Sequence, residues 1–160
     1  LVFFKPPSAL AYSGEQITLP PYSENIHFEG ELLLYIGDLS GKDRRNIGKE
    51  EALSIIEGVG VGIDLTARDV QDYETSRGYP WSKSKCFPQS ACVSDLTRIE
   101  YELHLNGERR QRGDTTLMIF PLPEMIHYLS HTYGLSEGDI IFTGTPEGAC
   151  RTPAKPTCAC

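Results

Sequence analysis

Three acidic residues of this chain have the type and spacing to hold a divalent cation. Glu29 and Glu31 occupy alternate positions in the stretch "NIHFEGEL", and Asp64 follows the apolar run "VGVGI". Alternate residues of a strand share a face, so His27, Glu29 and Glu31 are expected on one side of it. A buried carboxylate is costly unless something satisfies it, and the spacing alone leaves three alternatives: a metal cation, a basic side chain, or water at a solvated face.

The chemistry of a metal site follows from these oxygen donors. Two glutamates and one aspartate supply three hard ligands, whereas Mg²⁺ or Mn²⁺ prefers about six oxygens in an octahedron. Three positions would remain for water or substrate. A 2-oxo acid could fill two of them with its carboxylate and ketone oxygens. A Glu-x-Glu pair on a solvated strand face is the competing interpretation.

The elements that must position these residues include more strands than helices. Alternating or apolar runs predict strands over 26–36, 59–65, 99–105 and 138–144, and helical spacing predicts helices over 49–58, 67–78 and 121–134. Asn106-Gly107, after the third strand, is a strong hairpin signal because both residues tolerate positive φ. Without regular βαβ alternation, the expected class is α+β with a large mixed sheet.

Composition excludes several classes of function. A length of 160 residues fits one domain, and a net charge of −7 argues against a nucleic-acid partner. No apolar stretch is long enough to span a membrane. The five cysteines form no pair of C-x-x-C motifs, so a zinc knuckle is not expected and a reduced intracellular compartment is favoured over secretion.

Six motifs, in order, carry a family resemblance: "FFKPPSAL", "HFEGEL", "GIDLTARDVQ", "PWSKSK", "NGERRQRGDTTLMIF" and "GLSEGDIIFTGTPEG". The chain resembles the fumarylacetoacetate hydrolase family, in particular its small acylpyruvase and oxaloacetate decarboxylase branch, over residues 2–148. The resemblance implies a catalytic domain over residues 1–149, with the large mixed β-sheet roll and short peripheral helices of the family's C-terminal domain.

The resemblance also implies a metal and a reaction. It implies Mg²⁺ (or Mn²⁺) held by Glu29, Glu31 and Asp64. The implied reaction cleaves a C–C bond of a small 2-oxo acid, by acylpyruvate hydrolysis or oxaloacetate decarboxylation, through a metal-stabilised enolate. Two alternatives stay open: an isomerase or hydratase of aromatic-catabolism intermediates, and a metal- and oxo-acid-binding protein without turnover. A cytoplasmic homodimer is expected, with a mitochondrial location as the alternative for a eukaryotic source.

Five further residues receive expected roles. The resemblance implies that Lys85, Gln71 and Thr145 contact the substrate, and that Lys85 is catalytic because its charge stabilises the enolate. The alternatives for these three are a surface lysine, a solvated helix position and a simple turn residue. Arg68 is expected to orient a ligand carboxylate or to form a purely structural ion pair. His27 is expected to lie behind the ligands rather than to bind the metal.

Both ends of the chain depart from the family pattern. The family takes its general base from a His/Glu pair on a lid segment before the first motif; this chain starts at Leu1, so the lid is expected to be absent and no residue is assigned as the base. Residues 150–160 contain three cysteines and are expected to form an atypical tail. Lys5 and Ser8 lie in the first motif, but no chemistry is assigned to them.

Overall fold

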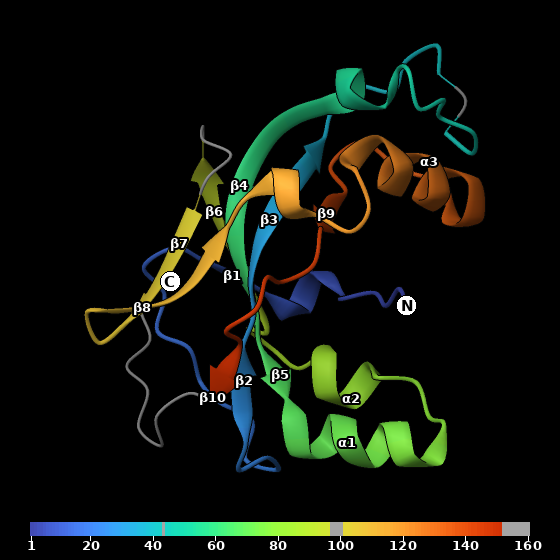
Figure 1. Cartoon of the computed structure of the whole chain (residues 1–160). Helices are drawn as coiled ribbons and strands as arrows, with labels where there is room; N and C mark the ends of the chain where they lie inside the picture. Colours follow the sequence, from blue (N-terminus) through green and yellow to red (C-terminus); the bar gives the residue numbers. More distant parts are fainter. Residues whose placement is uncertain (43, 97–100, 152–160) are drawn as a thin grey trace.

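A curved five-stranded sheet forms the centre of the fold, in the computed structural model, which describes residues 1–42, 44–96 and 101–151 (Figure 1). Its strand order is β1-β6-β4-β3-β9. The bounds are Leu10–Tyr12 for β1, Ala91–Leu96 for β6, Ile56–Asp64 for β4, Gly30–Ile36 for β3 and Ile140–Phe142 for β9. Strands β1 and β6 are parallel and the other neighbours are antiparallel, so the sheet is mixed.

Two smaller sheets flank the central one. The first has the order β10-β2-β5, with bounds Cys150–Arg151, Ile26–Phe28 and Thr66–Ala67. The second is the hairpin of β7 (Tyr101–Leu105) and β8 (Glu108–Gly113). Its turn residues Asn106 and Gly107 have φ values of 53° and 82°, which confirms the predicted hairpin.

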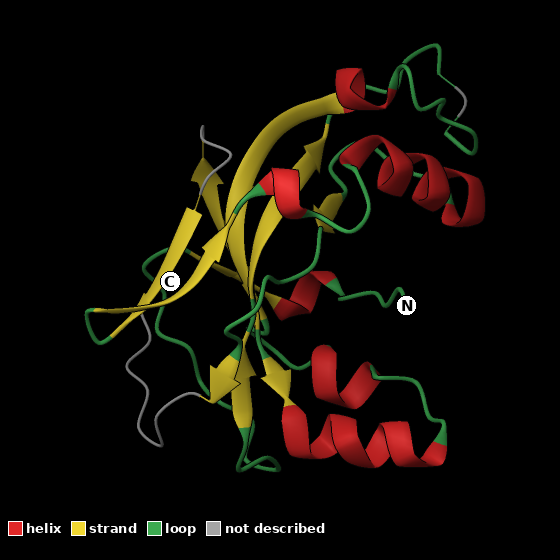
Figure 2. Cartoon of the chain, in the orientation of Figure 1, coloured by secondary structure: helices red, strands yellow, loops and turns green. Residues whose placement is uncertain are grey.

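Short helices lie on one side of the strands (Figure 2). The α-helices are α1 (Arg68–Arg77), α2 (Ser82–Lys85) and α3 (Leu122–Tyr133), and single 3₁₀ turns cover Pro7–Ala9, Ala52–Ile55 and Thr115–Leu117. Gly78 ends α1 in the left-handed conformation with φ 67°, as the sequence indicates. The mixed sheet with peripheral helices confirms the expected α+β class.

Three sequence predictions need correction. The helix expected over 49–58 is wrong: only the 3₁₀ turn Ala52–Ile55 forms, and β4 begins at Ile56. A short isolated helix is marginal, whereas β4 pairs with β3 and β6 along its length. The strand expected over 26–36 is two strands, broken at Glu29. Strand β6 was not predicted, and Ile99, where the next predicted strand begins, lies outside the described residues.

The β3 strand is the core element that carries Glu31 and directly follows Glu29. Its sequence GELLLYI is buried at every position except Tyr35, because the sheet is covered on both faces. One apolar cluster joins β3, β9 and α3 through Leu34, Ile126 and Ile141. Among the residues that the structure describes, no helix is long and apolar enough to cross a membrane.

Candidate metal centre

Pairing of β3 with β4 brings the three predicted acidic residues together. Glu31 pairs with Gly62, and the Asp64 amide donates to the Glu29 carbonyl oxygen over 2.8 Å. One carboxylate oxygen from each of Glu29, Glu31 and Asp64 lies within 4.8 Å of the others. The three residues are only 8%, 5% and 1% exposed, so the competing interpretation of a solvated strand face is wrong.

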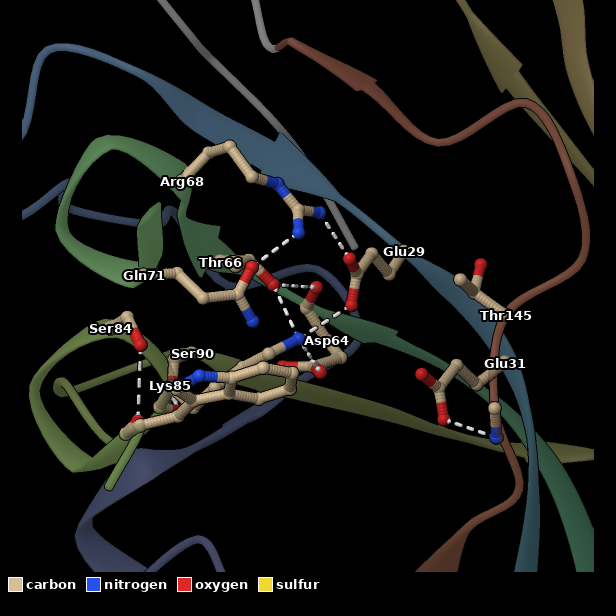
Figure 3. A network of polar contacts seen from close by, with 12 residues as sticks. Glu29, Glu31, Asp64, Thr66, Arg68, Gln71, Ser84, Lys85, Ser90 and Thr145 are labelled. Atoms are coloured by element: carbon tan, nitrogen blue, oxygen red, sulfur yellow. Dashed lines mark hydrogen bonds and ion pairs between the residues drawn. The ribbon is translucent and has the colours of Figure 1, made fainter. Parts of the chain in front are cut away.

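A buried lysine crosses between two of these carboxylates (Figure 3). The Lys85 ammonium donates to Glu29 Oε2 and Asp64 Oδ2, both at 2.5 Å, and to Thr66 Oγ1 at 2.6 Å. Lys85 is 2% exposed, whereas Lys83 on the same helix is exposed. The surface-lysine alternative therefore applies to Lys83 and not to Lys85.

A second lysine, Lys5, whose side chain is 9% exposed and for which no role was predicted, reaches the same site from the N-terminal segment. Lys5 Nζ lies 2.7 Å from Asp64 Oδ1 and donates to the Lys85 carbonyl oxygen, and to Ser90 Oγ at 2.9 Å. Burial lowers the pKa of Lys5, although the Asp64 carboxylate opposes this. Lys5 thus links the N-terminal segment, one acidic residue and the backbone that carries Lys85.

Arg68 and Gln71 form the third side of the site. Arg68, the first residue of α1, donates to Glu29 Oε1 and to the Gln71 side-chain oxygen. Burial acts to raise the pKa of Glu29, but the Lys85 and Arg68 cations together hold it below its ordinary value. Gln71 is 5% exposed, so the alternative of a solvated helix position is wrong.

Glu31 differs from its two neighbours because the described residues provide no ion-pair partner for it. The Gly144 amide donates to Glu31 Oε2 over 2.8 Å. Burial and the nearby Asp64 carboxylate nevertheless raise the pKa of Glu31 to about 8. A cation that shared its oxygens would remove this penalty.

Asp64 supplies a second sign that the donor set fits a hard cation. Burial raises the pKa of Asp64 despite the opposing charges of Lys5 and Lys85. Its Oδ1 is buried and accepts no hydrogen bond, since the Lys5 contact is an ion pair without hydrogen-bond geometry. Three buried carboxylates, one of them without an ion-pair partner among the described residues, suit Mg²⁺ or Mn²⁺.

Thr145 and His27 reach the surroundings of the centre by different routes. Thr145 follows β9, and its hydroxyl donates to the Gly30 carbonyl oxygen over 3.0 Å, between the two glutamates. Figure 3 shows Thr145 beside Glu31. His27 lies in β2, two residues before Glu29, and is half-buried. The break between β2 and β3 means that the two strands belong to different sheets.

Three of the residues in this network were missed by sequence reasoning: Lys5, Thr66 and Ser90. A Lys-Pro dipeptide in a proline-rich segment carries no local pattern that reveals a buried partner. Thr66 could have been found, because it lies two residues after Asp64 in the "GIDLT" motif. Ser90 contributes through a loop contact that depends on tertiary structure.

Comparison with known proteins gives consistent matches along the chain. The family model for the fumarylacetoacetate (FAA) hydrolase C-terminal region matches residues 1–159. The chain is 40% identical over 157 residues to the human mitochondrial protein named oxaloacetate tautomerase FAHD1, a match that covers 92% of this chain and 69% of the relative.

Solved structures match the fold as well as the sequence. Fumarylpyruvate hydrolase from Pseudomonas aeruginosa, in complex with Mn²⁺ and pyruvate, superposes with a TM-score of 0.83 at 35% identity, covering 94% of this chain and 69% of that one. The 5-carboxymethyl-2-hydroxymuconate delta-isomerase from Mycobacterium smegmatis has a TM-score of 0.83 at 29% identity, covering 94% and 59%.

Proposed function

The chain belongs to the fumarylacetoacetate hydrolase family, and we propose that it is a divalent-metal-dependent enzyme that cleaves a C–C bond of a small 2-oxo acid. The observation that carries this proposal is the set of three buried carboxylates with oxygens within 4.8 Å of one another, joined by a buried lysine. The Mn²⁺ and pyruvate bound by the fumarylpyruvate hydrolase relative support it. Residues 1–149 are the proposed catalytic domain.

Glu29, Glu31 and Asp64 are the proposed ligands of Mg²⁺ or Mn²⁺. When bound, the metal ion acts as a Lewis acid that polarises the 2-oxo group of the substrate. Strand pairing fixes the relative positions of these ligands, because Glu31 lies on β3, Glu29 directly precedes that strand, and Asp64 ends the neighbouring strand β4. Arg68 holds Glu29 through one of its oxygens and so fixes the orientation of that carboxylate.

Lys85 is the proposed catalytic residue. Its three N–H donors point to Glu29, Asp64 and Thr66. Neutralisation of the two carboxylates by a metal would weaken their hold on the ammonium, which could then donate to substrate. Loss of CO₂ from oxaloacetate, or transfer of the acyl group of an acylpyruvate to water as a carboxylic acid, leaves the electron pair of the broken C–C bond, which moves onto the 2-oxo oxygen. The Lys85 charge would stabilise that oxygen.

Gln71 and Thr145 are proposed to bind the substrate from two sides. Gln71 approaches from α1, and Thr145 lies in the turn after β9, near the backbone N–H of Gly144. Decarboxylation needs no activation of water, but the enolate that it leaves must take up a proton on carbon to become pyruvate. Hydrolysis also needs a general base that removes a proton from water, and we assign no residue to that role.

A second candidate function is keto–enol interconversion of oxaloacetate. The observation that favours it is the name of the human relative, oxaloacetate tautomerase, at 40% identity. Tautomerisation needs the same polarised ketone and a proton moved to or from the adjacent carbon, without cleavage of a C–C bond. Substrate class and metal would therefore be common to both candidates.

One set of assays separates these reactions. Purified protein with Mg²⁺ or Mn²⁺ is given acetylpyruvate and oxaloacetate, and pyruvate release is measured together with loss of the oxaloacetate enol absorbance. Pyruvate release from either substrate supports the first proposal, whereas enol loss without pyruvate supports the second. Binding of oxalate by the metal-loaded protein with neither reaction would favour the non-catalytic binding alternative.

A homodimer and an intracellular compartment complete the proposal. Leu117, Ile119 and Phe120 are 81%, 90% and 63% exposed, and apolar side chains gathered in this way commonly mark an interface. Light scattering is expected to give twice the 17.8-kDa chain mass. The human relative is a mitochondrial protein, which supports a mitochondrial or cytoplasmic location here.

A further inference from the structure

One glutamine outside the predicted site connects the start of β3, at Gly30, to the turn after β9 that contains Thr145 and Pro146. Gln111 lies on β8, in the hairpin, and its side chain is 2% exposed. Its Oε1 accepts from the Gly30 amide at 2.9 Å, between Glu29 and Glu31. Its Nε2 donates to Thr145 Oγ1 at 2.7 Å and to the Pro146 carbonyl oxygen at 3.0 Å. A single buried amide thus contacts both halves of the site.

The chemistry of its partners fixes the orientation of this amide. The Gly30 N–H can only donate, so it must face the amide oxygen, and the Pro146 carbonyl can only accept, so it must face the NH₂ group. Both constraints give the same orientation of Gln111. Thr145 Oγ1 then accepts from Gln111 and directs its own proton to the Gly30 carbonyl oxygen at 3.0 Å.

The hairpin packs directly against Gly30. A Cβ at Gly30 would lie 2.9 Å from Leu103 Cδ1 and 3.1 Å from Gln111 Oε1. The Tyr101 hydroxyl also donates to the Gly30 carbonyl oxygen, at 3.2 Å. The N–H and the carbonyl oxygen of Gly30 are therefore both hydrogen-bonded by side chains that lie outside β3.

From these contacts we propose that Gln111 is a positioning residue of the active site. Through Gly30 it fixes the backbone between the two glutamates, and through Thr145 and Pro146 it fixes the turn after β9, which is proposed to bind the substrate. This inference rests on the proposed function. Because the Thr145 proton is directed to Gly30, the hydroxyl presents only a lone pair to a ligand. Anionic substrate oxygens are then bound by backbone N–H groups of the turn, whose placement depends on Gln111.

Two substitutions separate the two arms of the amide. Gln111→Glu keeps an acceptor for the Gly30 N–H but cannot donate to Thr145 or Pro146. It should lower the oxalate affinity of the Mn²⁺-loaded protein about 10-fold while Mn²⁺ affinity changes less than about threefold. Gln111→Met removes all three hydrogen bonds with little change in volume, and it should lower the affinity for both Mn²⁺ and oxalate about 10-fold.

A double-mutant cycle distinguishes positioning from a merely structural contribution. If Gln111 acts on oxalate through Thr145, then Gln111→Glu and Thr145→Val should each weaken oxalate binding, and the double variant should be little weaker than either alone. Arg109→Gln, an exposed position on the same strand, should leave both affinities unchanged. Calorimetry gives both affinities, and thermal unfolding verifies that each variant is folded.

Three results would overturn the proposal. The first is wild-type oxalate affinity in folded Gln111→Glu protein. The second is a fully additive double variant, which would mean that Gln111 does not act through Thr145. The third is a wild-type protein that binds no Mn²⁺, which would contradict the proposed function and remove this inference with it; the first two results leave the proposed function standing.

Discussion

The Lys85 ammonium lies 2.5 Å from Asp64 Oδ2, and both side chains are almost completely buried. The same ammonium is 2.5 Å from Glu29 Oε2. It therefore occupies two of the three carboxylates that are proposed to bind the metal ion. Lysine and metal compete for the same carboxylates, and this competition has consequences that can be measured.

Lys85→Met should separate metal binding from substrate binding. Mn²⁺ affinity should be unchanged or increased, because the competing ammonium is gone, whereas oxalate affinity should fall at least about 10-fold because its cationic partner is lost. Calorimetry of Mn²⁺ and then oxalate binding tests this. Lys83→Met, on the exposed side of the same helix, is the matched control. Oxalate affinity equal to that of the wild type would refute the role of Lys85.

Lys5→Met should destabilise the metal-free protein. Asp64 Oδ1 would lose its cation, and removal of one partner from a buried ion pair costs about 3 kcal/mol of unfolding free energy. Saturating Mn²⁺ should recover part of this loss, since the metal supplies positive charge to Asp64. Urea unfolding with and without Mn²⁺ measures both effects.

The control for Lys5 is an exposed ion pair. The Lys49 and Glu124 side chains are 51% and 49% exposed, so Lys49→Met should cost less than about 1 kcal/mol. If the Lys5 and Lys49 variants lost equal amounts of unfolding free energy, burial of the Lys5–Asp64 contact would contribute nothing to stability.

Glu31 should make the stability of the metal-free protein depend on pH. Its pKa of about 8 exceeds the ordinary value of 4.5, so the folded state retains a proton that the unfolded state has released. Stability from this group is complete below pH 4.5 and is lost as the pH rises towards 8, with a slope of at most about 1.4 kcal/mol per pH unit.

Comparison with Glu31→Gln isolates this effect from the other ionisable groups. The amide keeps the acceptor for the Gly144 amide but does not titrate between these pH values. The wild type should therefore lose stability relative to the variant as the pH rises from 5 to 8 without metal. A difference in melting temperature between the two proteins that stays constant across this pH range would contradict the assignment.

Gly30 should tolerate no side chain. Gly30→Ala places a Cβ against Leu103 and Gln111 and should destabilise the protein by about 1–3 kcal/mol. Gly58→Ala is the matched control in the same sheet, because its Cβ would lie 3.8 Å from the Tyr35 ring, an ordinary contact. An equal free energy of unfolding for the two variants would contradict close packing of the hairpin against Gly30.

Local signals in the sequence account for the parts of the fold that were predicted correctly. The hairpin turn at Asn106 and Gly107 and the end of α1 at Gly78 each depend on residues that adopt positive φ easily. The predicted helix over 49–58 failed because its last residues, 56–58, begin β4, where pairing with β3 outweighs a weak local preference. Such pairing is not visible in a stretch taken alone.

The site was predictable to the extent that its residues lie in recognisable motifs. Glu29, Glu31 and Asp64 do converge, although the metal that we propose for them remains a prediction. Lys5 and Gln111 were not foreseen, because their partners lie far away in the sequence. Alternation along β8 could indicate that Gln111 faces inward, but not that it contacts Gly30 and Thr145. Of the tail expected over 150–160, Cys150–Arg151 form β10, and residues 152–160 lie outside the described residues.

Calorimetric titration of Mn²⁺ into the wild type and three single variants tests the central claim most directly. We expect one Mn²⁺ per chain in the wild type, and affinity lowered on the order of 100-fold in Glu29→Gln, Glu31→Gln and Asp64→Asn. Glu74→Gln removes a buried carboxylate that instead accepts from Ser84 and the Lys83 amide, so its Mn²⁺ affinity should match the wild type. Absence of Mn²⁺ binding by the wild type, or undiminished affinity in the three acidic-site variants, would contradict the account.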